Sequence, residues 1–197
     1  MKGKRLPVLI FVAALVVLGI YLATAYNTLV RKEEKIKLQW NEIQNVYQRR
    51  LDLVPSLVNT VKGLADFEQT TLENIAEARS KAAQVSISAS NPSAESFRQQ
   101  QTLQDNLAVA TNRLLISVEK YPSLKGTAAF AGLQTQLEGT ERRIKVARKD
   151  FNAAVADYNN SVRSFPSSVA ARLFAFKTKE GFEAVVNADK AIEIKFN

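Results

Sequence analysis

An apolar segment close to the N-terminus limits what this chain can fold into more than any other feature of its sequence. Residues 6–25 form a run of 20 largely apolar residues, and no charged side chain occurs between Arg5 and Arg31. As a helix the run is roughly 30 Å long, which matches the hydrocarbon core of a bilayer. The sequence therefore predicts one membrane-spanning helix at residues 6–25.

A cleaved signal peptide is the alternative interpretation of this segment. Residues 23–25 read Ala-Thr-Ala directly after the apolar run, which matches the small-residue pattern that precedes a signal-peptidase site, so cleavage before Tyr26 is conceivable. Against cleavage, the apolar run is long, and a helical pattern begins at once at Tyr26. We therefore favour the uncleaved anchor.

The distribution of charge indicates how such an anchor is oriented. Lys2, Lys4 and Arg5 precede the apolar run without any acidic residue, and basic residues on a short flank keep that flank in the cytoplasm. We therefore expect a cytoplasmic N-terminus, a single pass through the cytoplasmic membrane, and residues 26–197 on its outer side, in the periplasm or outside the cell.

The composition removes most enzyme chemistry. The 197 residues include no His and no Cys, which excludes zinc sites with N or S ligands, iron–sulfur clusters and Ser–His or Cys–His nucleophiles. We therefore expect no catalytic residue, no cofactor and no metal site. An enzyme of carboxylate or hydroxyl chemistry stays open, although no such residues converge in the sequence pattern.

Long helical periods follow the apolar run, and no strand pattern is evident. One helical face steps by three and four residues through Ile36, Trp40, Ile43, Tyr47 and Leu51. Asp52 is suited to cap a new helix that has Pro55 in its first turn, where a missing N–H costs nothing. We predict a tight turn near Asp52; the alternative is one continuous helix that Pro55 kinks.

Three further helices complete the pattern. The second continues to about residue 84 and ends before the polar stretch at 85–96, the third runs from about 94 to 119, and Tyr121-Pro122 ends it. The last helix has a large side chain at every seventh position: Phe130, Leu137, Ile144, Phe151, Tyr158 and Phe165. Such a repeat is typical of a bundle seam. The predicted fold is all-α, with an N-terminal transmembrane helix followed by an up-and-down four-helix bundle with long helices.

The C-terminal tail differs from the predicted bundle because it is rich in Phe. We divide the chain into a basic N-terminus with its anchor at 1–25, a bundle at 26–165, and a tail at 166–197. We favour a tail that contains a short helix and packs back on the bundle. The alternative is an exposed apolar patch for a partner or for the bilayer surface.

Several segments of this chain resemble the LemA family of bacterial membrane-anchored proteins. They read YNTLVRKEEKI at 26–36, RRLDLVPSLVNTVKGLADFE at 49–68, YPSLKG at 121–126, F..L...LEGTERRI...R..FN..V..YN at 130–159 and FPSSVAARLFAFKTKEGF at 165–182. The resemblance implies a short cytoplasmic N-terminus, one transmembrane segment and a helical bundle outside the cytoplasm. It supplies no activity, although some members have been linked to membrane-compartment formation or to neighbouring membrane proteases.

The polar candidates are structural or interaction residues rather than catalytic ones. Glu68 and Arg79 fall on the apolar face of the second predicted helix, where they either form a buried ion pair or face water. Arg49, Arg50 and Asp52, beside Pro55, hold a helix junction or form a recognition surface. Residues 141–150 carry five basic and two acidic side chains. In this run we expect Glu141 to pair with Lys145 on a solvated helix face that also carries Arg148.

The hypothesis is a non-enzymatic adaptor or scaffold, anchored in the bacterial cytoplasmic membrane and acting through protein–protein contacts at the cell envelope. Its expected partners are the membrane, an unidentified envelope or membrane protein, and further copies of the chain, but no nucleic acid, because basic residues here lack aromatic or base-reading partners. The alternatives are a regulator of a membrane protease or envelope-stress system, and a lipid- or wall-polymer-binding module.

Overall fold

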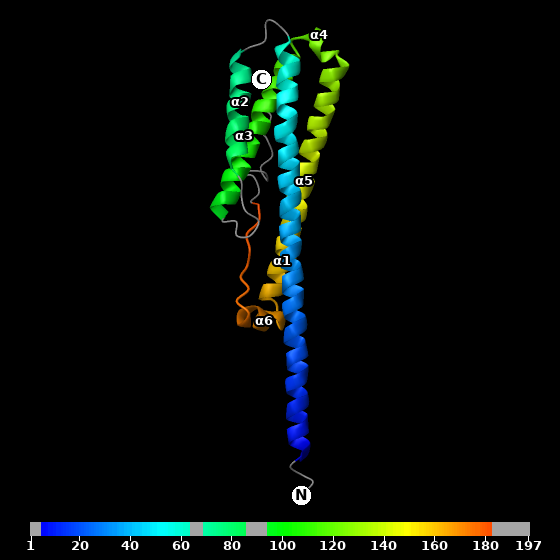
Figure 1. Cartoon of the computed structure of the whole chain (residues 1–197), viewed down its shortest axis with the longest axis vertical. Coiled ribbons are helices and arrows are strands. Elements are labelled where there is room, and N and C mark those ends of the chain that lie inside the picture. Colours follow the sequence, from blue (N-terminus) through cyan, green and yellow to red (C-terminus); the bar gives the residue numbers. More distant parts are fainter. Residues whose placement is uncertain (1–4, 64–68, 86–93, 183–197) are drawn as a thin grey trace, which may run out of the picture. The chain divides into compact units, whose positions relative to one another are not determined.

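A computed structural model describes residues 5–63, 69–85 and 94–182 of the chain (Figure 1). Every regular element in these ranges is an α-helix, and none of the described residues lies in a strand. The elements are α1 (Arg5–Lys62), α2 (Gln69–Gln84), α3 (Ala94–Val118), α4 (Pro122–Lys125), α5 (Ala128–Arg163) and α6 (Ser167–Leu173). The all-α class is therefore confirmed, whereas the up-and-down connectivity of a four-helix bundle stays a prediction.

Helix α1 is one continuous helix of 58 residues with Pro55 inside it. The predicted turn near Asp52 is therefore wrong, and the alternative of a continuous helix is correct. Proline removes a single backbone donor from a helix, and the structure supplies a substitute for that donor, as described below. The helix ends at Lys62, directly before Gly63, and Gly has the poorest helix propensity after Pro. The predicted second helix is thus divided between the end of α1 and α2.

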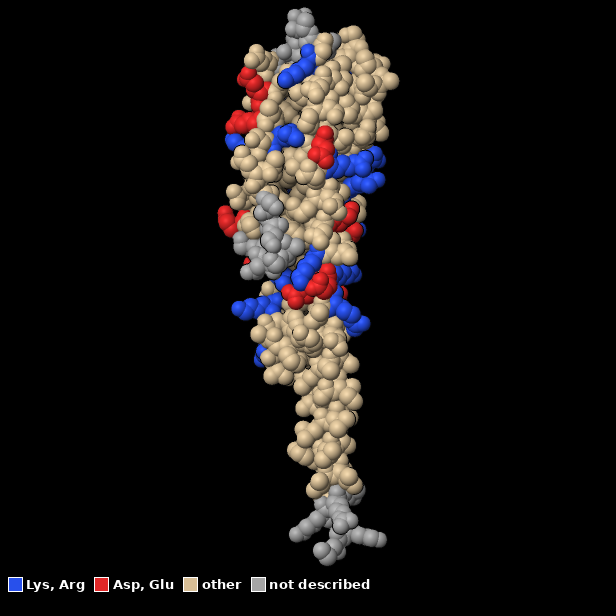
Figure 2. Space-filling view, in the orientation of Figure 1, with Lys and Arg blue, Asp and Glu red and all other residues tan. Residues whose placement is uncertain are grey.

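The N-terminal part of α1 is long and apolar enough to cross a membrane. Its large apolar side chains are exposed, and in Figure 2 this part of the surface shows neither blue nor red atoms. The exposed residues are Val8, Leu9, Ile10, Phe11, Val12, Leu15, Val16, Val17, Leu18 and Ile20. A surface of this kind is what the hydrocarbon of a bilayer covers.

Contacts divide the chain into two compact units, to both of which α1 and α5 contribute. Unit 1 comprises residues 1–46 and 142–180, and unit 2 comprises residues 47–141 and 181–197.

Unit 1 has an aromatic core between the N-terminal part of α1 and the C-terminal part of α5. The rings of Trp40 and Phe151 pack with centroids 5.7 Å apart, and both side chains are buried. The other buried residues of unit 1 include Leu29, Ile36, Ile43, Ile144, Ala147, Ala154, Val155, Tyr158, Ala170 and Ala171. Helix α6 thus contributes two Ala residues to the core of unit 1.

Unit 2 has a largely aliphatic core to which five helices contribute. Its buried members are Leu51, Val54, Leu57 and Val61 from α1, Ile75 and Ala82 from α2, Leu107, Leu114 and Val118 from α3, Leu124 from α4, and Phe130 and Leu137 from α5. Pro122 begins the short helix α4 that follows α3. The hydroxyl of Thr127 accepts a hydrogen bond of 3.3 Å from the Phe130 N–H, so Thr127 caps the first turn of α5.

The seven-residue series on α5 is confirmed at five of its six positions. Phe130, Leu137, Ile144, Phe151 and Tyr158 are each at most 3% exposed. Phe165, the sixth member, is 84% exposed, and its assignment to the seam is wrong. Helix α5 ends at Arg163, so the helical phase that places every seventh residue on one face does not extend to Phe165.

Candidate functional site

Arg50 is the centre of a buried polar cluster in unit 2. Only 2% of this α1 residue is exposed. Its Nη1 donates hydrogen bonds to the carbonyl oxygen of Gln104 in α3, at 2.8 Å, and to the Oε1 of the same residue, at 3.2 Å. Its Nη2 donates to the Oε2 of Glu141 in α5, at 2.5 Å. One guanidinium therefore joins three helices.

Unit 2 buries four further polar side chains besides that of Arg50. Gln100, Gln104, Thr111 and Thr140 are buried. The hydroxyls of Thr111 and Thr140 donate to carbonyls of their own helices. The Nε of Arg50 is buried without a hydrogen-bond partner. A buried charge is tolerated only when it is paired and hydrogen-bonded, so this cluster constrains how α1, α3 and α5 align.

Arg79 of α2 replaces the backbone donor that Pro55 lacks. In a regular helix the N–H of residue 55 would bond to the carbonyl of Leu51, four residues earlier, but proline has no N–H. The Nε–H of Arg79 donates to this Leu51 carbonyl at 3.0 Å. The bond satisfies a buried acceptor and connects α2 to α1. It explains why Pro55 is accommodated inside α1.

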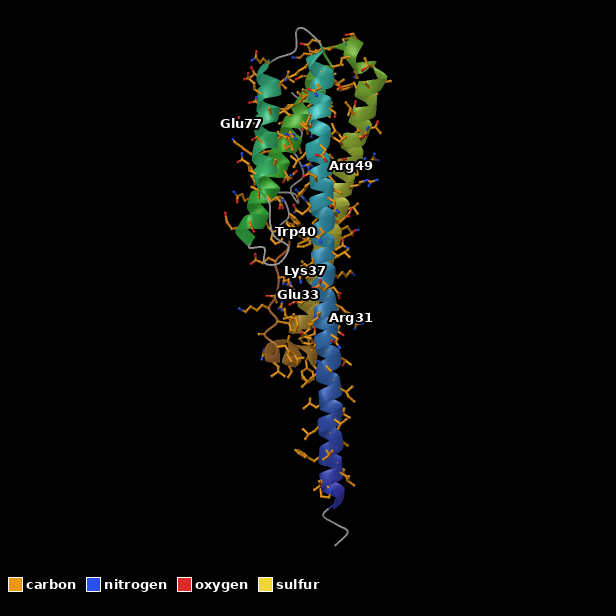
Figure 3. The ribbon with its side chains drawn as sticks, in the orientation of Figure 1. Arg31, Glu33, Lys37, Trp40, Arg49 and Glu77 are labelled. Carbon is orange, nitrogen blue, oxygen red and sulfur yellow. The ribbon has the colours of Figure 1, made fainter. Side chains whose placement is uncertain are left out.

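The structure places the other predicted residues apart from these contacts. Arg49 is exposed on α1 (Figure 3). Asp52 is exposed and accepts a hydrogen bond of 2.8 Å from the Nε2 of Gln48, so it caps no helix. Arg148 is half-buried and belongs to unit 1. Glu68 lies outside the described residues, so its predicted link to Arg79 stays a prediction.

Sequence reasoning missed the roles of Arg50 and Gln104, although a signal was present. On α1, Ile36, Ile43, Arg50 and Leu57 are seven residues apart, and Arg50 is the charged member of an otherwise apolar series. On α3, Gln104 and Thr111 interrupt a similar series. Glu141 was expected to pair with Lys145, four residues later, but Arg50 binds its carboxylate instead. Side chains that are polar at seam positions are the ones that fix register.

A second set of polar contacts holds the C-terminal segment to α5 and α1 in unit 1. The side-chain amide of Asn159 donates to the carbonyl of Lys179 at 2.7 Å and accepts from the N–H of the same residue at 2.8 Å. The Nζ of Lys179 pairs with Glu33 at 2.7 Å. The Tyr158 hydroxyl donates to the Lys177 carbonyl at 3.0 Å. Burial, followed by the nearby Glu33 carboxylate, raises the pKa of Tyr158 to about 12.

None of these groups is arranged for proton transfer or metal binding. Arg does not titrate in the physiological range and acts only as a donor. Among the described residues, no three His, Cys, Asp or Glu side chains lie close enough to hold a metal ion. The clusters therefore act chemically as hydrogen-bonded connections between helices.

Unit 1 also has a shallow surface hollow between α1 and α5. It is lined by Glu42 of α1 and by Arg142, Arg143, Val146, Ala147 and Asp150 of α5. Val146 is 57% exposed and is surrounded by charges of both signs. A single exposed apolar side chain is ordinary on a protein surface, so the hollow by itself assigns no ligand.

Comparison with known proteins identifies the family. Magnetosome proteins MamQ 1 and MamQ 2 of Paramagnetospirillum magneticum are each 26% identical over 184 residues, which cover 85% of this chain and 68% of theirs. Protein LemA of Metamycoplasma hominis is 22% identical over 146 residues, which cover 74% of this chain and 63% of that protein. The sequence model of the LemA family matches residues 39–196. The chain belongs to the LemA family.

Proposed function

We propose that this chain is a membrane-anchored scaffold or adaptor that acts through protein–protein contacts on the outer side of the bacterial cytoplasmic membrane and catalyses no reaction. The continuity of α1 carries the proposal. This helix is continuous over residues 5–62 and contains the apolar segment, Trp40 of unit 1 and Arg50 of unit 2. A tethered enzyme needs no such connection, whereas a protein that positions a binding surface near a membrane does.

The contacts around Arg50 and Arg79 support the same role. Arg50 links α1 to α3 and α5, and Arg79 links α2 to α1. The magnetosome relatives are named for a cellular structure rather than for a reaction. Both observations favour a protein that organises other molecules over one that converts a substrate.

Orientation is tested by thiol labelling in intact cells. Because the chain has no Cys, one introduced Cys is the only reactive thiol of the protein. We expect a membrane-impermeant maleimide to label Ile116→Cys, which replaces a side chain that is 67% exposed. Gly3→Cys, the matched variant on the N-terminal flank, should react only after the membrane is permeabilised. The reverse pattern would rule out the proposed orientation.

The same cells decide between an anchor and a cleaved signal peptide. The intact mass of the purified protein should include residues 1–25, because the apolar run of 20 residues is longer than the 7–15 residues usual in a signal peptide. A mass that begins at Tyr26 would show that the chain is released from its anchor.

The contact role is tested by photo-cross-linking in living cells. A photo-reactive amino acid is placed at Leu38 or Val146 in unit 1, and at Val109 or Ile116 on α3 in unit 2; all four side chains are exposed. We expect one pair of positions to yield a reproducible product and the other pair to serve as its control. A foreign membrane protein in the product makes the chain an adaptor, and a ladder of its own copies makes it a scaffold. Absence of any product at all four positions would overturn the proposal.

A further inference from the structure

Helix α6 lies beside the outer end of the apolar segment of α1. The ring of Tyr26 contacts Phe174 edge-on, with centroids 4.9 Å apart, and Phe176 at 5.7 Å. Ala170 and Ala171 of α6 are buried, and Ala25 of α1 is only 8% exposed. The aromatic contacts of Tyr26 thus hold the end of α6 beside α1 at the level where the predicted membrane span ends.

Residues 165–174 also present large apolar side chains to the surroundings. Val169 and Leu173, one helical turn apart, are 53% and 63% exposed. Phe165 is 84% exposed and Phe174 is 42% exposed. Four large apolar side chains within ten residues are unusual on a surface that faces water.

Basic and aromatic residues surround this apolar face. Arg163, Arg172 and Lys177 are exposed on the same stretch of chain, and Figure 2 shows Lys and Arg close above the apolar surface of α1. Tyr21 and Tyr26 lie on α1 near the end of the predicted span, and the Tyr21 hydroxyl is buried without a hydrogen-bond partner. Tyr side chains are enriched where a membrane meets water, and basic side chains near a bilayer are attracted to anionic headgroups.

We propose that α6, together with Phe165 and Phe174, is a second membrane-contact surface that rests in the headgroup region of the outer leaflet. The occupant is lipid because the surface continues directly from the segment that spans the bilayer. A span of residues 6–25 places the boundary of the hydrocarbon at Ala25, and the ring of the next residue, Tyr26, contacts Phe174 at the end of α6. The inference rests on the anchoring part of the proposed function and adds to it a fixed depth for unit 1 at the membrane.

Depth-dependent fluorescence quenching of the full-length protein tests this contact. Single-Cys variants carrying an environment-sensitive fluorophore are reconstituted in vesicles of phosphatidylcholine and phosphatidylglycerol, with and without lipid that bears a nitroxide near the headgroup end of its acyl chain. Leu173→Cys reports on α6. Leu38→Cys is its matched control, because it is the same residue type with the same 63% exposure but lies on α1 beyond the span. Leu18→Cys reports on the span itself.

We expect the label at Leu173 to lose most of its fluorescence to the nitroxide lipid and the label at Leu38 to keep it. Equal brightness at Leu173 and Leu38 would overturn the inference. A label at Leu173 that keeps its fluorescence in protein-rich vesicles, and is quenched only when the protein is diluted in lipid, would show that a second copy of the chain covers α6. That result would also overturn the inference. A label at Leu18 that escapes quenching would instead show that the anchor itself is wrong. The helical circular dichroism of each variant confirms that it is folded.

Discussion

The two units of the molecule are built with different chemistry, although α1 and α5 contribute to both. In unit 1 these helices bury an aromatic pair, Trp40 and Phe151, and their ion pairs, such as Lys32 with Asp157, remain partly exposed. In unit 2 they bury a guanidinium, and Arg50 bonds to α3 and α5 at once. On α1, the same seven-residue repeat buries Ile36 and Ile43 in unit 1 and the charged Arg50 in unit 2.

The difference teaches that packing and register are supplied by separate residues. Aromatic burial contributes a large free energy but tolerates sliding of one helix along another, because it has little directionality. A buried guanidinium contributes little net stability, but it is satisfied in only one alignment. Unit 1 should therefore be sensitive to lost volume, and unit 2 to lost partners.

The largest effect is expected from Phe151→Ala in unit 1. Removing this buried ring leaves a cavity beside Trp40, and we expect the free energy of unfolding to fall by about 4 kcal/mol. The matched control is Phe165→Ala, the same substitution at a side chain that is 84% exposed, which should change stability by less than about 0.5 kcal/mol. Urea unfolding of the full chain in detergent micelles, followed by circular dichroism, measures both. Equal losses would contradict the aromatic core.

The next effect is expected from Glu141→Gln in unit 2. The substitution keeps the shape of the side chain but leaves the buried Arg50 guanidinium without its counter-charge, which should cost about 3 kcal/mol. Glu138→Gln, one turn earlier on α5, alters a carboxylate that accepts only a surface bond from Gln134 and should cost less than about 0.5 kcal/mol.

A double variant shows whether the cost belongs to the buried charge. Arg50→Met together with Glu141→Gln removes both the charge and the need for a partner, so it should be more stable than Glu141→Gln alone. If the two substitutions are simply additive, Arg50 and Glu141 do not act as a pair.

A smaller effect is expected at the link between Arg79 and the Leu51 carbonyl. Arg79→Met leaves this buried acceptor unsatisfied and should cost about 1.5 kcal/mol. In a Pro55→Ala background residue 55 regains an N–H that can bond to the same carbonyl, so the cost of Arg79→Met should fall. If Arg79→Met costs the same stability with Pro55 as with Ala at position 55, Arg79 does not compensate for the missing N–H of Pro55. Thermal unfolding of the four proteins completes the cycle.

The smallest effect concerns the pH dependence of unit 1. The pKa of Tyr158 is raised from 10.0 to about 12 in the folded protein, so the unfolded chain loses this proton first as the pH rises. The stability that the neutral hydroxyl contributes is complete below pH 10 and is lost between pH 10 and about 12. Tyr158→Phe should be less stable than the unmodified chain at neutral pH, and the gap should narrow across this interval. A constant gap would contradict the shift.

Helix positions followed from the sequence where local signals agreed. The bounds of α3 match the prediction closely, because a polar stretch precedes it and Tyr121-Pro122 follows it. The continuous α1 could not be predicted with certainty, because the donor that compensates Pro55 comes from Arg79, on another helix. Helix-capping rules use only residues that are close in the sequence, so they predicted a helix break at Asp52.

The polar cluster was harder to predict than the helices for a related reason. Glu141 has a Lys four residues away and an Arg 91 residues away, and it binds the distant one. Spacing along one helix cannot reveal such a partner. The periodicity of α1 nevertheless places Arg50 on the buried face, so a charged residue in a seven-residue apolar series was the available signal.

The long sequence separation of the contacts in unit 1 has a consequence for how the protein is made. Lys32 and Asp157 are 125 residues apart. Phe151, the aromatic partner of Trp40, is likewise synthesised long after Trp40. At ordinary rates of synthesis this interval is roughly 6 to 25 s. During that time α1 is complete, yet its apolar face from Ile36 to Ile43 has no partner. The nascent chain must therefore be kept from aggregating until α5 has been made.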